Sequence, residues 1–294
     1  MLSVRNRVAE ILEEHGMEYY NHSGCFDIVA RGKRIMLLKT LANIDSFQEF
    51  QACNLKIMTK SLEASSFLVG VRTRREKLKD NIVYERFEIP AVTPDTLDSI
   101  LKEDLPKKYR FRGGLFAEIS PEKLRMQREE AGLSQAGLAK KVGVTKKSIY
   151  IYENRKIKIS SQTVARLEEL LGKISVPIDM SPDFSEVENK PCSRFESSVF
   201  RDLSKLGLQG KFVYQAPFNI VARGTEFTLL SDADERQERI EKKMPDMINF
   251  SDITKKPVLI VTREEVEFEL PSIKEGDLKA LESPRELKKL LKTW

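Results

Sequence analysis

The sequence predicts a multidomain α+β protein in which an all-α bundle lies between two copies of a small α/β domain. The chain has 294 residues, a length that suits two or three domains, each with its own core. Residues 26–32 read FDIVARG and residues 218–224 read FNIVARG, and the similarity continues on both sides of these segments. Residues 120–172 instead carry the caps and glycines of a series of short helices.

The first copy reads as a small mixed sheet with flanking helices. Two short apolar runs around Arg31-Gly32-Lys33 predict a hairpin, and a continuous apolar run predicts a strand that is buried on both faces. The expected elements are a helix at Val4–His15, strands at Phe26–Ala30 and Ile35–Leu38, a helix at Ser46–Ser61, a strand at Phe67–Val71 and a closing helix at Pro94–Lys102.

The second copy repeats this order, with an apolar run at Phe227–Leu230 after the shared heptapeptide and helices at Phe195–Leu206 and Pro284–Leu291. Duplicated folds often pack as a pseudo-dimer or as matching halves of a symmetric assembly. The predicted domains are an α/β copy at 1–104, a basic linker at 105–119, the helical module at 120–172, a linker at 173–190 and the second copy at 191–294.

Composition excludes several classes of protein. A hydrophobic fraction of 40% is too high for a disordered chain, and no apolar run is long enough to span a bilayer. The N-terminus lacks the apolar core of a secretory signal, so a cytoplasmic protein without a membrane partner is expected.

Few residues are suited to metal or enzyme chemistry. The three cysteines are scattered and imply no disulfide framework. His22 and Cys25 could ligate a metal, but a loop histidine beside a small buried thiol is the favoured interpretation. The sequence also lacks GxSxG, Walker and Rossmann glycine patterns, so it predicts no catalytic residues, no metal and no cofactor.

Positive charge is concentrated in one segment. Residues 120–172 contain eleven Lys or Arg and six Asp or Glu, so this part carries the whole net charge of +5. Such asymmetry suits an anionic partner such as a nucleic-acid backbone.

The same segment predicts four helices, each with a hydroxyl cap. Ser120, Ser134 and Thr145 cap the first three, and Ser160 or Ser161 caps the fourth. Gly143 permits the left-handed backbone of a sharp turn between the second helix, Gln135–Val142, and the third, Lys146–Asn154. The residues expected to be buried together are Leu124, Leu133, Leu138, Ala139, Val142, Val144, Ile149, Tyr152, Val164, Leu167 and Leu171.

This pattern, LSQAGLAKKVGVTKKSIYIYENRK, resembles the Cro/C1-repressor class of helix-turn-helix domains. Two positions depart from that class: Gly137 replaces an acid in the second helix, and Arg155 replaces a glycine after the third. The whole layout, with Gly113–Ser120 leading into the module, resembles an archaeal family of helix-turn-helix transcriptional regulatory proteins.

The resemblance implies that the third helix reads double-stranded DNA. Lysines can donate to guanine O6 and N7 in the major groove, and Ile151 is suited to a thymine methyl group. A homodimer on two half-sites is the expected assembly. The implied DNA-binding residues are Gln135, Thr145, Lys146, Lys147, Ser148, Tyr150, Ile151, Arg155, Lys156 and Lys158.

Just before the module, residues 107–112 form the basic and aromatic run Lys-Lys-Tyr-Arg-Phe-Arg. Such a run could be an arm that follows a phosphate strand or enters a minor groove. It could equally be a linker whose Tyr109 and Phe111 dock on a neighbouring domain.

The first copy also resembles PD-(D/E)xK nucleases and junction resolvases, with Asp27 opening one strand and Lys39 at the end of the next. That chemistry needs a second carboxylate at position 37, which is leucine, and one carboxylate alone does not hold a catalytic Mg²⁺. In the second copy Asn219 replaces the aspartate and Ser231 the lysine. Both copies are therefore predicted to be degenerate and non-enzymatic. A Mg²⁺-dependent nuclease and a protein-interaction adaptor remain as alternatives.

Overall fold

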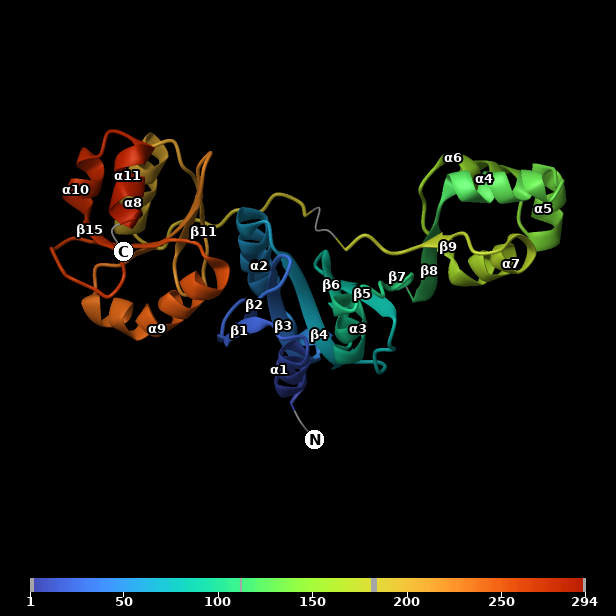
Figure 1. The fold of residues 1–294 in the computed structure, drawn as a ribbon, viewed down its shortest axis with the longest axis horizontal. Helices are drawn as coiled ribbons and strands as arrows, with labels where there is room; N and C mark the ends of the chain where they lie inside the picture. The colour runs from blue at the N-terminus through green and yellow to red at the C-terminus, as the bar shows by residue number, and fades with distance from the viewer. Residues whose placement is uncertain (1–2, 112, 181–183, 293–294) are drawn as a thin grey trace. The chain divides into compact units, whose positions relative to one another are not determined.

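The computed structural model describes residues 3–111, 113–180 and 184–292 of the chain. The protein is a mixed α/β structure that divides into two compact units (Figure 1). Unit 1 contains Met1–Val69, Phe87–Ile89 and Pro182–Trp294, and unit 2 contains Gly70–Arg86 and Pro90–Ser181. None of the described helices is both long and apolar enough to cross a membrane.

The N-terminal part of unit 1 is a sheet with the strand order β1-β2-β3-β4. Arg31 faces Ile35 across the antiparallel β2–β3 pair, which confirms the predicted hairpin. One face of α1, with Val8, Ile11 and Leu12, is buried and packs against β3. The elements are α1 (Val4–Glu14), β1 (Glu18–Asn21), β2 (Ile28–Arg31), β3 (Ile35–Asn43), the 3₁₀ turn η1 (Ile44–Ser46), α2 (Glu49–Leu62) and β4 (Ser65–Arg72).

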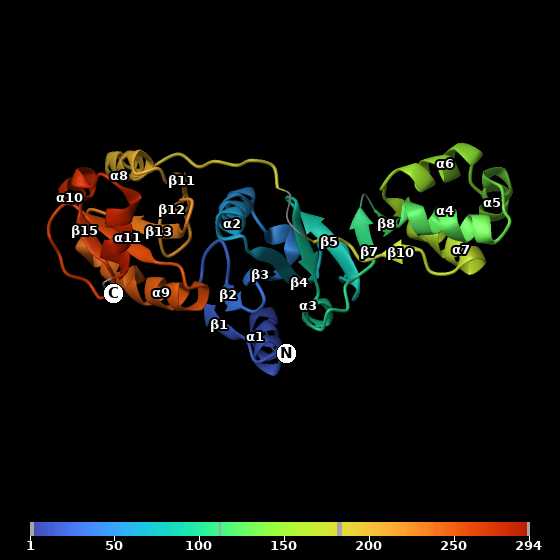
Figure 2. The ribbon, with the colours of Figure 1, turned by 45° about the horizontal axis from the view of Figure 1, so that its top comes forward.

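The C-terminal part of unit 1 has the strand order β11-β12-β13-β14-β15, in which the first three strands are antiparallel and the last two add in parallel. Helix α9 lies on one side of this sheet, and α8, α10 and α11 lie on the other (Figure 2). The elements are α8 (Arg194–Lys205), β11 (Gln209–Phe212), β12 (Ile220–Arg223), β13 (Thr228–Ala233), α9 (Gln237–Thr254), β14 (Val258–Thr262), β15 (Ser272–Lys274), α10 (Glu275–Ala280) and α11 (Pro284–Lys292).

Both parts thus begin with a helix, three antiparallel strands, a helix and a strand. The predicted closing helices at Pro94–Lys102 and Pro284–Leu291 are present as α3 (Pro94–Leu101) and α11. Strand β6 (Ile89–Val92) precedes α3, whereas α10 lies between β15 and α11.

Within unit 1 the two parts contact each other reciprocally. Helix α9 packs on β1 and β2 of the N-terminal part, and α2 packs on β12 of the C-terminal part. Phe250 of α9 lies between Phe26 and Phe218, with ring centroids 5.6 and 5.2 Å away. The Cys25 N–H donates to the Gln215 carbonyl at 2.8 Å, so the loops that precede β2 and β12 meet directly.

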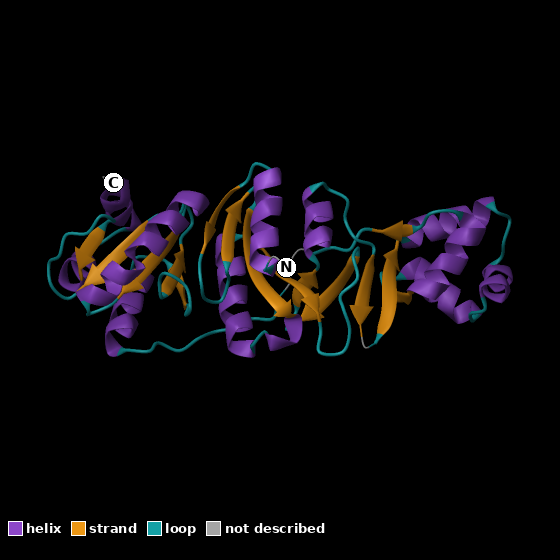
Figure 3. Cartoon of the chain, turned by 90° about the horizontal axis from the view of Figure 1, so that it is seen from below, coloured by secondary structure: helices purple, strands orange, loops and turns teal. Residues whose placement is uncertain are grey.

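Unit 2 contains a second sheet segment, with the order β6-β5-β7-β8-β10, and a helical bundle (Figure 3). Its strands are β5 (Ile82–Arg86), β6, β7 (Lys108–Phe111), β8 (Gly114–Ile119), β9 (Ile159–Ser160) and β10 (Ser175–Val176). Strand β9 also pairs with β8 but is not part of this strand order.

The prediction of a basic linker at 105–119 was wrong. Residues 108–111 and 114–119 form the antiparallel hairpin β7–β8, and β7 also pairs in parallel with β5. Tyr109, Ala117 and Ile119 are buried, because these strands supply apolar residues to the cores of unit 2. Pairing with β5 and β9 is non-local, so the turn-forming and basic residues of this segment did not reveal it.

The bundle consists of α4 (Pro121–Glu130), α5 (Gln135–Val142), α6 (Lys146–Asn154) and α7 (Ser161–Leu171). Side chains of Ser120, Ser134, Thr145 and Ser160 cap these helices, as predicted. Gly143 has φ +77°, the left-handed turn that the sequence required. The predicted apolar residues form one cluster, which Ala117, Ile119, Ile159 and Ile174 of the surrounding segments complete.

Candidate nucleic-acid interface

Helix α6 presents a polar and aromatic surface at its N-terminal half. The Thr145 hydroxyl accepts the Ser148 N–H at 3.0 Å and so fixes the start of the helix. Lys146 and Lys147 are exposed in the first turn, and Tyr150 follows with 57% of its surface exposed. Ile149 points the other way and is fully buried, which anchors the helix on the domain core.

Two of the predicted contact residues on α6 are less exposed to solvent than Lys146, Lys147 and Tyr150. Ser148 and Ile151 are half-buried, and the Ser148 hydroxyl lies 2.9 Å from the Thr145 hydroxyl. Lys146, Lys147 and Tyr150 are therefore the residues of α6 that the structure gathers on its open surface.

A buried ion pair holds α6 against the first two helices of the bundle. Arg128 of α4 donates from Nη2 to Oε2 of Glu153 at 3.2 Å and from Nη1 to the Leu133 carbonyl at 2.8 Å. The carboxylate of Glu153 raises the pKa of Arg128, because its hydrogen bond favours the charged guanidinium. No pattern in the sequence predicted this pair, although Glu153 belongs to the helix-turn-helix motif.

Gln135 takes part in the same network. Its Nε2 donates to Oε2 of Glu153 at 2.7 Å, so one amide hydrogen is used inside the domain. The second amide hydrogen and the backbone N–H groups at the start of α5 are the donors suited to the predicted phosphate contact.

The three predicted basic residues after α6 are exposed. Arg155 ends the helix in an extended conformation with φ −142°, so this position does not require the glycine that is usual in the helix-turn-helix class. Lys158 places its Nζ 4.5 Å from the ring centre of Tyr109 and 5.3 Å from that of Phe111. Lys156 is the third member of this group.

Residues 108–111 of the basic and aromatic run form strand β7 rather than a free arm. The ring of Tyr109 stacks on Phe116 of the same hairpin, with centroids 6.0 Å apart, and burial raises the pKa of the phenol. These contacts favour the alternative in which Tyr109 docks on the protein rather than on DNA. Phe111 keeps 38% of its surface exposed. Arg112 lies outside the described residues.

The nuclease-like position in the N-terminal part is closed by its own side chains. Oδ1 of Asp27 accepts from Lys39 Nζ at 2.8 Å, and Oδ2 accepts from the Thr40 N–H at 2.8 Å and the Thr40 hydroxyl at 3.0 Å. Leu37, at the position where a second carboxylate is needed, is fully buried. Asn219, the counterpart of Asp27, bonds both the N–H and the carbonyl of Ala233 at 2.9 Å.

No group of three metal-ligating side chains occurs in the described part of the chain. His22 contacts Asp246 of α9 through Nδ1 at 3.0 Å, and Cys25 is fully buried, which raises the pKa of its thiol to about 12. This agrees with the favoured interpretation of a loop histidine beside a buried thiol.

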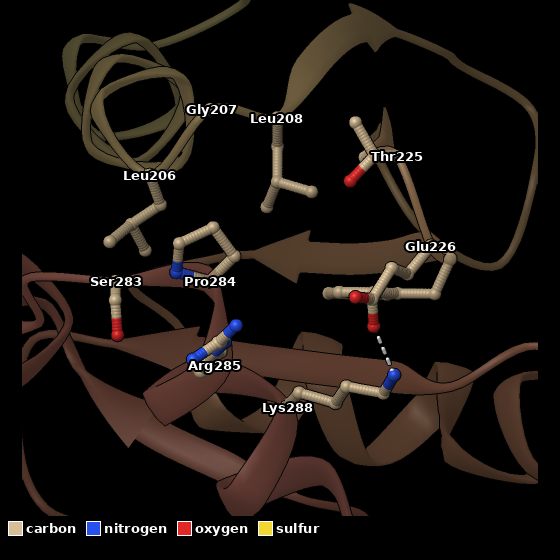
Figure 4. A pocket seen from close by; sticks show the side chains of 11 residues that line it. Leu206, Gly207, Leu208, Thr225, Glu226, Ser283, Pro284, Arg285 and Lys288 are labelled. Atoms are coloured by element: carbon tan, nitrogen blue, oxygen red, sulfur yellow. Dashed lines mark hydrogen bonds and ion pairs between the residues drawn. The ribbon is translucent and has the colours of Figure 1, made fainter.

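One cavity that the sequence did not predict lies within the C-terminal part (Figure 4). It has a volume of about 420 Å³, and Leu206, Leu208 and Pro284 form an apolar wall. At its rim Lys288 pairs with Glu226, beside Arg285. The residues that line it are scattered over three segments, so no sequence motif could have revealed it.

Two family models match separate parts of the chain. Residues 2–106 match a PD-(D/E)XK superfamily domain, and residues 124–177 match a helix-turn-helix domain. A relative from Thermococcus gammatolerans, named "Putative HTH-type transcriptional regulatory protein", is 35% identical across 97% of this chain and 94% of its own length. No solved structure matches the chain.

Two further relatives carry the same description. The protein from Methanothermobacter thermautotrophicus is 32% identical across 98% of this chain and 95% of its own length. The protein from Pyrococcus furiosus is 41% identical across 73% of this chain and 70% of its own length. The similarity to these archaeal proteins therefore extends well beyond the helix-turn-helix segment.

Proposed function

This chain belongs to the archaeal family of HTH-type transcriptional regulatory proteins, and from that premise we propose that it binds double-stranded DNA sequence-specifically through helix α6. The observation that carries the proposal is the surface of α6. Lys146, Lys147 and Tyr150 are exposed on a helix whose orientation the buried Arg128–Glu153 pair fixes. A rigid helix with lysines at its N-terminal end is the element that enters a major groove in helix-turn-helix proteins.

We assign separate roles to the contact residues. Lys146 and Lys147 donate to base edges, Ser148 donates to a base or a phosphate, and Ile151 contacts a thymine methyl group. The remaining residues position the domain on the sugar–phosphate backbone. These are Gln135 and Thr145 beside the helix starts, Tyr150 on the open surface of α6, and Arg155, Lys156 and Lys158 after it.

We infer that the two parts of unit 1 are duplicated copies of one domain and that they pair within a single chain. The shared element order and the reciprocal α2–β12 and α9–β2 contacts support this inference. These two helix faces are therefore occupied inside the chain. We propose a homodimer through other surfaces, because two half-sites about one helical turn apart provide the affinity that a single domain lacks.

A nuclease is the competing function, and the match of residues 2–106 to a PD-(D/E)XK domain favours it. The side chains at the corresponding position argue against nuclease activity. Leu37 replaces the second carboxylate, and both oxygens of Asp27 are taken up by Lys39 and Thr40. We propose that the domain serves structure and pairing without catalysis, and that the protein acts on chromosomal DNA in the cytoplasm.

Selection of bound duplexes from a random pool, followed by binding measurements on the selected and random sequences, tests this function. The double variant Lys146→Ala/Lys147→Ala should lose about 10- to 100-fold in affinity for the selected sequence and far less for random DNA. Equal losses on both would mean that these lysines contact phosphate only. A wild-type protein without salt-dependent duplex binding would favour the adaptor alternative.

A further inference from the structure

Unit 2 carries a second concentration of positive charge, outside the helix-turn-helix bundle. Five of the eight residues 72–79, which we name the basic turn, are lysine or arginine. All five are exposed: Arg72, Arg74, Arg75, Lys77 and Lys79. The one acid among these residues is Glu76, and its carboxylate lies 3.0 Å from Nη2 of Arg110 on β7.

The backbone of the basic turn is held in one conformation. The Thr73 N–H donates to the Glu76 carbonyl at 2.8 Å, and the Leu78 N–H donates to the Val71 carbonyl at 2.9 Å. The side chain of Leu78 is buried, with 8% of its surface exposed. The cationic side chains therefore project from a fixed base, and little backbone entropy is lost when they bind an anion.

A series of contacts within unit 2 connects the basic turn to the segment that follows α6. Strand β5 comes after the turn and pairs with β7, so that Ile82 lies opposite Lys108. Lys158, four residues after α6 ends, lies over the rings of Tyr109 and Phe111 on β7. The hairpin β7–β8 is in turn paired with β9 through Ala117 and Ile159.

We propose that the basic turn is a second DNA-contact surface, which binds duplex phosphates independently of sequence next to the site that α6 reads. This inference rests on the proposed function. Duplex DNA carries one phosphate charge per about 1.7 Å, so several exposed cations on one short turn can each meet a phosphate. Aromatic residues, on which unpaired bases stack, are absent from residues 72–79, which favours a duplex over a single strand.

The test uses the full chain and a mixed-sequence duplex, for which no operator is needed. The variant Arg75→Gln/Lys77→Gln/Lys79→Gln removes three charges from the basic turn. Arg239→Gln/Lys242→Gln/Lys279→Gln removes the same charge from exposed positions on α9 and α10 and is the matched control. Affinity is measured by fluorescence anisotropy over a series of salt concentrations.

We expect the basic-turn variant to reduce the slope of log affinity against log salt by about 2 to 3, and to bind at least about tenfold more weakly at low salt. The control should bind like the wild type. An unchanged slope in the basic-turn variant would overturn this inference alone. If the wild type shows no salt-dependent duplex binding, the proposed function fails with it. A loss confined to single-stranded RNA would overturn the assignment to duplex DNA.

Discussion

Lys39, in the middle of β3, forms a buried ion pair with Asp27, just before β2, with Nζ 2.8 Å from Oδ1 and each side chain about nine-tenths buried. The N-terminal part matches a PD-(D/E)XK superfamily domain, and in this chain the two side chains pair with each other. The Lys39 ammonium also donates to the Gly24 carbonyl at 2.8 Å, so the pair belongs to the packing of the loop before β2.

Breaking this pair should destabilise the protein. We expect no DNA cleavage from the wild type, so the substitution should remove none. Asp27→Ala leaves Lys39 buried and unpaired, and we expect the free energy of unfolding to fall by about 3–5 kcal/mol. The double variant Asp27→Leu/Lys39→Met should recover most of that loss in denaturant titrations. Plasmid DNA should stay intact with Mg²⁺ or Mn²⁺; cleavage that disappears in Asp27→Ala would contradict our interpretation.

Gly24→Ala tests the contact between the two halves of unit 1. A Cβ at position 24 would lie 2.0 Å from the Gln215 carbonyl oxygen, so the loops before β2 and β12 would have to separate. We expect a destabilisation of about 2 kcal/mol or more, as for other overpacked sites. Gly276→Ala is the control, because a Cβ there meets nothing within 4 Å and alanine favours the helix. Similar melting temperatures for both variants would argue against the contact.

Glu153→Ala should loosen the helix-turn-helix bundle selectively. The substitution leaves Arg128 without its buried partner, a change that costs about 3–5 kcal/mol. Gln135→Ala removes a single hydrogen bond to the same carboxylate and should cost about 1–2 kcal/mol. Hydrogen exchange followed by mass spectrometry should show faster exchange in residues 121–171 and no change in 194–292. The exposed Glu130→Ala provides the baseline, and uniform acceleration in both regions would contradict a local role.

Arg155→Ala should weaken DNA binding without altering sequence preference. Arg155 is exposed directly after α6, where a guanidinium reaches phosphate rather than base edges. We expect the salt slope to fall by about 1 and the affinity for selected and random duplexes to fall by the same factor. A loss restricted to the selected duplex would assign Arg155 to base recognition instead.

Asp232 should make the stability of the protein depend on pH. Complete burial raises its pKa from 3.8 to about 6, although Lys243 binds the carboxylate at 2.7 Å. The pKa of Asp232 is higher in the folded state than in the unfolded state. The contribution of Asp232 to the free energy of unfolding is therefore fully present below pH 3.8 and is lost as the pH rises through 6.

The measurement is a series of urea titrations between pH 4 and pH 7 on wild type and Asp232→Asn. Stability of the wild type relative to the variant should fall by about 3 kcal/mol over this range, since two pKa units correspond to that free energy. Exposed Asp252→Asn is the matched control. If the difference in unfolding free energy between the wild type and Asp232→Asn does not change with pH, the ion pair with Lys243 offsets the cost of burying the Asp232 carboxylate throughout this range.

Local patterns in the sequence were sufficient for the helices of the bundle. The caps Ser120, Ser134 and Thr145 act on their own backbone within three residues, and Gly143 adopts the left-handed turn that its position requires. The similarity of FDIVARG and FNIVARG likewise located two hairpins that the structure contains. The caps and glycines predicted the bounds of α6, and the resemblance to helix-turn-helix domains implied that its lysines are exposed.

Pairing between distant segments was decided only by the tertiary structure. The hairpin β7–β8 exists because β5 and β9 bond to it, and Glu153 is buried because Arg128, 25 residues earlier, reaches it. Asp27 and Lys39 close on each other, and Gly24 meets Gln215, for the same reason. Caps and turns are fixed by atoms a few bonds apart, whereas these contacts depend on how whole elements pack, a choice that no short stretch of residues contains.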